Sequence, residues 1–367
     1  MAGALNDIEE LQASMLRSLA SAHRLRILHL LASPAWSGPA ESVALLAAAQ
    51  RALGHEVSIA VDRKRFGPSS EEPIVPRLLA LGLLDEGGLE LSVKSSPLAA
   101  VRDVRALARR PLDAVHAHFS HDHLIARFGK PRGARLVRSI HAPRSLRWSL
   151  PRADAFTVPT AADAIKLAGR RVLVLPPLVG PEYRPPTDRA VLRRELGLEG
   201  EPLLGMVSTF QPSRNHAVGL EAFGLVRRER PGARLVLVGD GALESSLRTQ
   251  AERLGLAKNV TFAGYQPGPS FVRWLQALDE VWVLGLGNDY SGRAAAQARA
   301  CGVRVVAVDE GALAARADVT LAALSPEALA KASLSGHRSE KPWPSSGEIA
   351  ASVLELYRSE SPAGSRP

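Results

Sequence analysis

Four histidines stand close together in one short segment, and their imidazole rings could bind a metal ion, contact a ligand or hydrogen-bond to the backbone. They are His116, His118, His121 and His123. Imidazole is a common ligand of transition metals. Asp122 is, however, the one carboxylate among them, so the acidic partners of a metal centre are missing. The segment therefore predicts no metal site, and it leaves open ligand contact or hydrogen bonding at a strand end.

A second chemical feature lies at residues 291–293, where a loop enters an Ala-rich helix. The first turn of a helix offers backbone N–H groups and the positive end of the helix dipole, which together favour a bound phosphate. Gly292 permits a close approach of the backbone to such a ligand. Arg293 could add its charge to the phosphate or could be a solvated charge at the start of the helix.

Several other catalytic motifs are missing from the sequence. It has no P-loop, no HExxH zinc motif and no GxSxG nucleophile elbow. Two glycines within residues 238–241 follow an expected strand, but the third glycine and the acidic partner of a dinucleotide-binding loop are absent. The sequence therefore does not support four classes of protein: a P-loop ATPase, a zinc hydrolase, a serine hydrolase or an NAD enzyme.

Short apolar segments alternate with helical patterns along most of the chain. Such segments predict parallel strands, because a parallel strand is covered on both faces. In the first half we expect strands at residues 26–33, 56–61, 89–93, 114–117, 135–140, 155–158 and 172–175. In the second half we expect them at residues 203–207, 234–238, 260–263, 280–284 and 303–308. The predicted fold class is α/β, with two doubly wound Rossmann-like domains.

The prolines of residues 176–186 predict an extended linker between these domains. We expect the first domain at residues 25–180 and the second at residues 181–340. An amphipathic helix is expected within residues 1–24. Residues 341–367 are expected to form a helix and tail that cross back to the first domain.

Charge is distributed unevenly between the halves. The net charge is +9, of which +8 lies in residues 1–180. This excess could attract phosphate-bearing ligands, nucleic acid or an anionic membrane, although a GC-rich genome that encodes Arg instead of Lys would also explain it.

Cys301, the one cysteine, suits a reducing compartment. The first residues lack the pattern of a signal peptide, so we expect a cytoplasmic protein. Peripheral contact with the inner membrane face remains open.

Seven short motifs occur in an order that resembles one enzyme family. They cover residues 37–41, 53–57, 113–118, 139–141, 205–214, 235–241 and 260–264. Each match is weak, but their shared order argues against chance. Over residues 25–335 the chain resembles the retaining glycosyltransferases of family four, also called group 1, whose two-domain fold is known as GT-B. This resemblance implies an acceptor-binding first domain and a donor-binding second domain that face each other across a cleft.

The family's Glu-x₇-Glu motif is altered in this chain. The resemblance places Asp289 at the first glutamate, which binds hydroxyls of the donor sugar, and Gln297 at the second, which binds the ribose. Gln297 keeps one acceptor oxygen but loses the charge, and a plain helix residue packed on a strand is its alternative role. Thr209 stands where the family has an arginine that binds the diphosphate, and Arg214 stands where it has a lysine. Arg293 could replace the lost cation.

The remaining site assignments also follow from the resemblance. The catalytic residues would be His118 and Asp289. The donor-binding residues would be Gly38, Thr209, Arg214, Ser291, Gly292, Arg293 and Gln297. The residues on the acceptor side of the cleft would be His116, Arg138 and His141.

The resemblance implies transfer of a sugar from a nucleotide-diphosphate sugar to a glycan, lipid-linked or small-molecule acceptor, with retention of configuration and without a metal or cofactor. Two alternatives remain. The altered motif also fits a catalytically weakened protein that binds nucleotide sugars or assists an active enzyme. Residues 15–32 also resemble the first two helices of winged-helix repressors, although a strand follows where a recognition helix should be. We expect no nucleic-acid partner.

Overall fold

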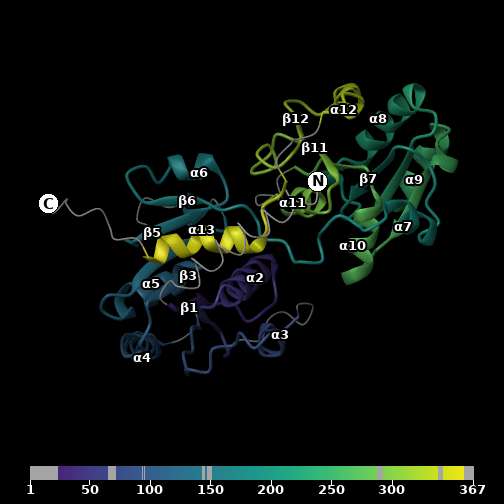
Figure 1. Ribbon diagram of the computed structural model, residues 1–367. Helices are drawn as coiled ribbons and strands as arrows, with labels where there is room; N and C mark the ends of the chain where they lie inside the picture. Colours follow the sequence, from purple (N-terminus) through teal and green to yellow (C-terminus); the bar gives the residue numbers. More distant parts are fainter. Residues whose placement is uncertain are drawn as a thin grey trace, which may run out of the picture. The chain divides into compact units, whose positions relative to one another are not determined.

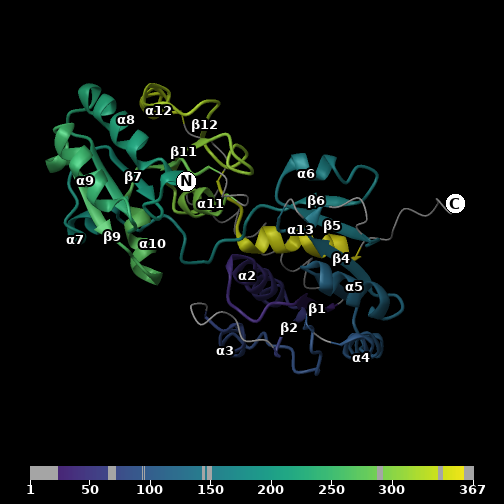
Figure 2. The same cartoon turned by 180° about the vertical axis from the view of Figure 1, so that it is seen from behind.

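The computed structural model describes residues 24–64, 72–92, 94, 96–142, 145–146, 151–286, 292–337 and 342–358. The chain divides into two compact units (Figures 1 and 2). Unit 1 comprises Met1–Leu178 and Ser345–Pro367, and unit 2 comprises Val179–Pro344. The helix predicted within residues 1–24 lies outside the described residues, which begin at Arg24.

Unit 1 contains a six-stranded parallel sheet in the order β2-β1-β3-β4-β5-β6. Its strands are β1 (Arg26–Leu31), β2 (Glu56–Val61), β3 (Ala114–Ala117), β4 (Arg135–Ser139), β5 (Ala155–Val158) and β6 (Val172–Val174). Its helices are α2 (Gly38–Ala52), α3 (Ile74–Ala80), α4 (Pro97–Ala108), α5 (Ser120–Gly129), α6 (Ala161–Ile165) and α13 (Ser346–Arg358). Buried side chains of α2 and α13 share one core cluster, and those of α4 and α5 contribute to another. Figure 1 shows α13 beside α2.

Unit 2 contains a second six-stranded parallel sheet, in the order β12-β11-β10-β7-β8-β9. Its strands are β7 (Leu203–Val207), β8 (Arg234–Val238), β9 (Val260–Gly264), β10 (Glu280–Val283), β11 (Arg304–Val308) and β12 (Val319–Leu321). Its α-helices are α7 (Arg189–Glu195), α8 (His216–Glu229), α9 (Glu244–Arg253), α10 (Gly268–Ala277), α11 (Arg293–Ala300) and α12 (Pro326–Leu334), with 3₁₀ turns η2 (Pro212–Arg214) and η3 (Ala257–Asn259). The predicted doubly wound α/β fold is therefore confirmed.

Each sheet contains one topological switch point, where the chain stops adding strands on one side and starts on the other. In unit 1 it lies between β1 and β3, and in unit 2 between β7 and β10. In open α/β sheets, ligands bind at the carboxyl ends of the strands that flank this point. These two edges are therefore the places where functional side chains are expected.

Two expectations from the sequence are wrong. The strand expected at residues 89–93 does not form in the described part, residues 89–92. Leu91 adopts a left-handed conformation, and the Asp103 carboxylate accepts hydrogen bonds from the backbone N–H groups of Glu90 and Leu91. The apolar alternation there reflects burial of side chains rather than strand pairing. The winged-helix alternative also fails, because Arg26–Leu31 is a strand inside the sheet and not a helix.

None of the helices in the described residues is long and apolar enough to cross a membrane. Cys301 is buried at the end of α11, and burial raises the pKa of its thiol to about 12. The thiol is therefore protonated at neutral pH.

Gly239 and Gly241 allow two backbone segments of unit 2 to touch. The N–H of Phe210 donates to the carbonyl of Asp240 at 2.7 Å. A Cβ on Gly239 would lie 2.2 Å from the Ser208 carbonyl oxygen, and Gly239 has a φ of +141°. The Gly-Asp-Gly sequence therefore fixes the loop that follows β7.

Gly239→Ala should destabilise the protein by at least about 3 kcal/mol, because it combines a backbone clash with a conformation that only glycine adopts readily. Gly255→Ala is the matched control, since Gly255 also has a positive φ but a Cβ there meets nothing within 4 Å. The control should cost about 1 kcal/mol. Urea unfolding measures both, and equal losses would contradict the close approach at Gly239.

Candidate functional site

The loop after β7 lies at the switch point of unit 2 and is tied to the end of β10. Asn215 adopts a left-handed conformation with a φ of 56°, and its side-chain amide donates to the Leu284 carbonyl at 2.8 Å. The N–H of Leu286 donates to the Ser213 carbonyl at 2.9 Å. The turn η2 between β7 and α8 is therefore held at the carboxyl edge of the sheet.

This arrangement places Arg214 over the backbone at the end of β10. A Cβ on Gly285 would lie 2.6 Å from Nη1 of Arg214, so the guanidinium packs directly against the backbone there. Nε of Arg214 is buried and has no hydrogen-bond partner among the described residues. A buried guanidinium nitrogen favours an anionic ligand such as a phosphate. Gly285 was not predicted, because it lies far from Arg214 in the chain.

His216 lies beside Arg214 at the start of α8. It is buried, and burial together with the nearby Arg214 charge lowers its pKa to about 4. Its Nε2 lies 3.4 Å from the Ser208 hydroxyl, and its Nδ1 has no partner within the described part of the chain. A neutral imidazole therefore sits next to the Arg214 cation. His216 was not predicted from the sequence.

The start of α11 supplies the second part of this edge. Gly292 caps the helix with a φ of 63°, and a Cβ there would lie 2.8 Å from Cδ of the buried Arg316. Arg293 is the first residue of α11, and Gln297 is buried one turn further along. Asp289 and Ser291 lie outside the described residues.

Two other predicted donor-site residues have simpler surroundings. Thr209 is exposed in the loop after β7. Gly38 is exposed at the first turn of α2, which follows β1, and the Ser37 hydroxyl caps that helix by accepting from the Ala40 N–H at 3.4 Å. The motif at residues 37–41 therefore lies at the N-terminus of a helix in unit 1.

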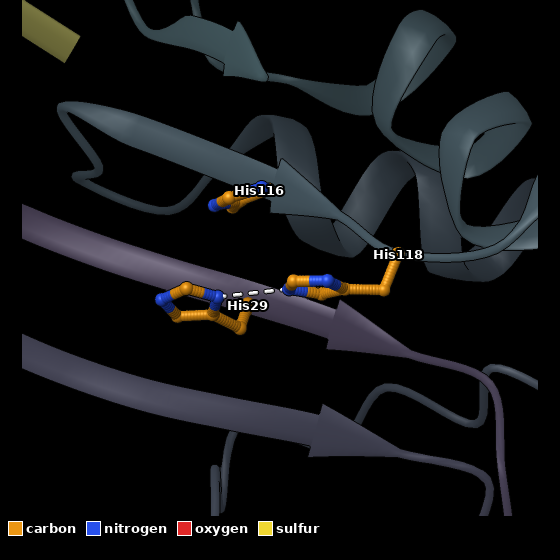
Figure 3. Close-up of side chains that lie close together, drawn as sticks. All are labelled: His29, His116 and His118. Carbon is orange, nitrogen blue, oxygen red and sulfur yellow. Dashed lines mark hydrogen bonds between the residues drawn. The ribbon is translucent and has the colours of Figure 1, made fainter. Parts of the chain in front are cut away.

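Three histidines lie side by side at the switch point of unit 1 (Figure 3). His29 of β1 lies opposite His116 of β3 in the sheet, and His118 follows β3 directly. Nδ1 of His29 lies 3.0 Å from Nε2 of His118, and the rings of His116 and His118 stack at 4.5 Å. All three side chains are buried. His29 was not predicted, because a single histidine in an apolar strand carries no motif.

Hydrogen bonds extend this group in both directions. Nε2 of His29 lies 2.8 Å from the amide oxygen of Gln50, and Nδ1 of His118 lies 3.1 Å from Nε2 of His141. His116 bonds to the Tyr357 hydroxyl through Nδ1 at 2.6 Å and to a serine hydroxyl through Nε2 at 2.8 Å. The predicted residues His116, His118 and His141 therefore belong to one network.

The same three rings could be read as a metal site, since one nitrogen from each of His29, His116 and His118 lies within 4.8 Å of the others. Both nitrogens of each ring, however, already have hydrogen-bond partners. A metal ion would have to displace several of these bonds. The absence of a metal site remains a prediction.

Burial keeps the histidine network neutral. It lowers the pKa of His29 and of His141 to about 4, with the Arg138 charge adding to the effect at His141. Burial also lowers the pKa values of His116 and His118 well below their usual range, and neighbouring histidines and Arg138 contribute. At neutral pH each ring therefore carries a single proton.

Arg138 is a fully buried cation on β4. Burial lowers its pKa to about 10, so the guanidinium remains charged at neutral pH, and the Asp122 charge opposes the shift. Its three guanidinium nitrogens have no hydrogen-bond partner among the described residues. Asp122 itself accepts bonds from the backbone N–H groups of Ala32, His118 and Phe119. The acceptor role of Arg138 remains a prediction.

Lowering the pH from about 7.5 to about 5 should destabilise the protein. The folded pKa values of these histidines lie below the unfolded value, so the unfolded state binds more protons between about pH 4 and pH 6.5. Stability is then complete above that window and falls within it as the pH drops, by about 2 kcal/mol at pH 5 for a histidine such as His29. Burial raises the pKa values of Asp122 and Glu280, which act in the opposite sense.

Urea unfolding across this pH range measures the effect. The loss should persist at high salt, because it arises from burial and not from surface charge. A free energy of unfolding that does not change down to pH 5 would contradict the neutral network.

Comparison with known proteins places the chain in a family. Residues 36–182 match the model described as Glycosyltransferase Family 4, and residues 188–316 match Glycosyl transferases group 1. A D-inositol 3-phosphate glycosyltransferase of Segniliparus rotundus is 36% identical over 149 residues, which are 39% of this chain and 33% of that protein. One of Actinosynnema mirum is 37% identical over 171 residues, which are 44% of this chain and 40% of that protein. The chain thus matches well under half the length of these curated relatives.

Among solved structures, Anabaena HepE in complex with UDP superimposes with a TM-score of 0.64 at 19% identity, covering 91% of this chain and 95% of that chain. HepE in complex with UDP-glucose superimposes with a TM-score of 0.58. These likenesses show the fold, and the two family matches follow each other in order along most of the chain. The chain belongs to the group 1, family 4 glycosyltransferases and has the GT-B fold.

Proposed function

We propose that this protein transfers a sugar from a nucleoside diphosphate sugar to a hydroxyl group of an acceptor, with retention of configuration. Unit 2 binds the donor and unit 1 binds the acceptor. One observation carries the proposal: the Arg214 guanidinium lies at the switch point of unit 2, over Gly285, with Nε buried and without a partner among the described residues. The family membership and the UDP and UDP-glucose bound to HepE support it.

The chemistry follows from where charge develops. When the bond between the sugar and the diphosphate breaks, negative charge grows on the diphosphate, and groups already placed around it lower the barrier. In this chain Arg214, Arg293 and the N-terminus of α11 supply that stabilisation. Gly292 lets the diphosphate approach the helix closely. These groups act without a metal ion.

His141 contributes a neutral ring to the acceptor side, and the buried His118 holds it through a hydrogen bond. They lie at the carboxyl edge of the unit 1 sheet, His118 after β3 and His141 after β4. A neutral imidazole can accept or donate one hydrogen bond, which suits the hydroxyl groups of a sugar or polyol. The inositol phosphate named for the curated relatives is one such polyol.

Arg214→Ala should weaken UDP binding between about ten-fold and a hundred-fold, because it removes charge-assisted hydrogen bonds to phosphate. Isothermal titration in the presence of a chelator measures this. Arg253→Ala, at an exposed arginine of α9, is the matched control and should bind UDP normally. Unchanged affinity in Arg214→Ala would remove Arg214 from the site. Wild-type binding that is lost in chelator would refute a metal-independent donor site.

Gln297→Glu should tighten binding of uridine by about 1 kcal/mol, because a carboxylate offers a second acceptor to the ribose hydroxyls. Uridine is the probe because its lack of phosphate avoids repulsion from the new charge. Gln250→Glu, at a partly buried glutamine of α9, is the control. Equal affinities for wild type and Gln297→Glu would indicate that residue 297 does not face the ribose.

A binding protein with weakened catalysis is the second candidate, and two observations favour it. Thr209 is exposed where the family has a cation, and Gln297 is a neutral side chain at a position where the family has a carboxylate. The two candidates differ in turnover and not in affinity. Release of UDP from UDP-glucose, measured with and without polyol acceptors, separates them: binding of UDP without such release would favour the weakened protein.

A further inference from the structure

Eight buried or partly buried side chains of unit 1 form one continuous chain of hydrogen bonds. In order they are His141, His118, His29, Gln50, Tyr357, His116, Ser139 and Thr157. We propose that Gln50 and Tyr357 make all hydrogen bonds of this chain point the same way from donor to acceptor. His141, at its end, then presents an unprotonated Nδ1 to a hydroxyl group of the ligand. The ligand part of this inference rests on the proposed function, whereas the direction of the chain does not.

Gln50 occupies the middle of the chain, and its amide has two unlike ends. The oxygen can only accept a hydrogen bond and the nitrogen can only donate. Oε1 faces Nε2 of His29 at 2.8 Å, and Nε2 faces the Tyr357 hydroxyl oxygen at 3.2 Å. His29 must therefore donate from its Nε2. Gln50 itself is fully buried, so water does not offer its amide alternative partners.

The protonation of the other rings follows from this one contact. A neutral imidazole has one N–H, so Nδ1 of His29 must accept, and the donor is Nε2 of His118 at 3.0 Å. The same rule makes Nδ1 of His118 an acceptor for Nε2–H of His141 at 3.1 Å. His141 is left with an unprotonated Nδ1. The low pKa values of these four rings keep each of them in a singly protonated state at neutral pH.

Gln50 divides the hydrogen-bonded chain into two arms, one that ends at His141 and one that ends at Thr157. In the second arm the hydrogen bonds point the same way from donor to acceptor as in the first. The Gln50 amide donates to the Tyr357 oxygen, so the Tyr357 hydroxyl donates to Nδ1 of His116 at 2.6 Å. His116 then carries its proton on Nε2 and donates to Ser139 at 2.8 Å, and Ser139 donates to Thr157 at 2.6 Å. Hydrogen bonds that all point one way polarise and strengthen one another. If the Gln50 amide turned over, every bond in the chain would reverse.

The end of the chain lies where it can meet a ligand. His141 is only partly buried and follows β4 at the carboxyl edge of the sheet, whereas His29, His116 and His118 are buried. A ring with a lone pair there accepts a hydrogen bond from a hydroxyl group and does not donate one to an ether or carbonyl oxygen. Gln50 and Tyr357 are thus positioning residues, which act on the ligand through His141.

The wild-type protein without ligand provides the first test. Nitrogen-15 NMR of histidine-labelled protein distinguishes an Nε2–H ring from an Nδ1–H ring. We expect Nε2–H for His29, His116, His118 and His141. An Nδ1–H tautomer at His29, His118 or His141 would overturn the proposal. Shifts typical of metal-bound nitrogen, together with zinc that copurifies with the protein, would show a metal site instead and would overturn it too.

Gln50→Met provides the second test, since methionine is similar in size but cannot fix the direction of the chain. We expect His141 to become a mixture of both tautomers and kcat to fall about ten-fold, on the scale of one lost hydrogen bond. Affinity for UDP should not change, because unit 2 binds it. Gln250→Met, at the partly buried glutamine of α9 in unit 2, is the control. A single Nε2–H tautomer at His141 in folded Gln50→Met would overturn the proposal.

Tyr357→Phe separates the two arms. His116 should then become a mixture of both tautomers, while Gln50 still holds His29, His118 and His141 in the Nε2–H form. Simultaneous change at all four rings would contradict the central role of Gln50. If wild type shows the expected tautomers but transfers no sugar, the proposed function fails and the direction of the chain stands. If the wild type transfers sugar but shows the opposite tautomers, the proposed function stands and the direction of the hydrogen bonds is wrong.

Discussion

Both candidate sites depend on one constraint of the parallel sheet, the single reversal of strand order. After the two strands that flank the switch point, the chain connections run to opposite sides of the sheet. The loops that follow these strands therefore diverge, and this opens the carboxyl edge between β1 and β3 and between β7 and β10. The loop after β7 occupies one such edge and carries Arg214 across to Gly285. His29 and His118 meet at the other. The residues are distant in sequence, and only the strand order brings them together.

Burial neutralises histidines at both edges, and the two edges differ in the other groups that surround these rings. In unit 1 it removes charge from the histidines, so that the network is held by neutral hydrogen bonds. In unit 2 burial also lowers the pKa of His216, and the nearby Arg214 guanidinium adds to the effect. The neutral histidine network of unit 1, beside which Arg138 is a buried cation, suits hydroxyl groups, and the Arg214 guanidinium of unit 2 suits a diphosphate. The two units share a fold, and the groups at each edge are what separates their proposed ligands.

The sequence could predict what depends on local pattern. Buried parallel strands such as Ala155–Val158 are short apolar segments, and their bounds were predicted correctly. The segment at residues 89–92 looks the same in sequence, but its backbone bonds to the Asp103 carboxylate, which no periodicity reveals. The three-residue strand β12 is too short to show a pattern. For the candidate site, Arg214 and His118 came from motifs, whereas His29, His216 and Gly285 act through tertiary contacts that motifs do not encode.

Tyr357 shows why such contacts escape prediction, and also what they accomplish. It lies on α13, 307 residues after Gln50 and 241 residues after His116, yet it bonds to both. The chain leaves unit 1 after Leu178, forms unit 2, and returns with α13 to pack beside α2. Without this return the amide nitrogen of Gln50 and Nδ1 of His116 would lose their shared partner in a buried place, where an unmade hydrogen bond is costly. By packing beside α2, helix α13 therefore completes the core of unit 1 and, through Tyr357, the polar network within that core.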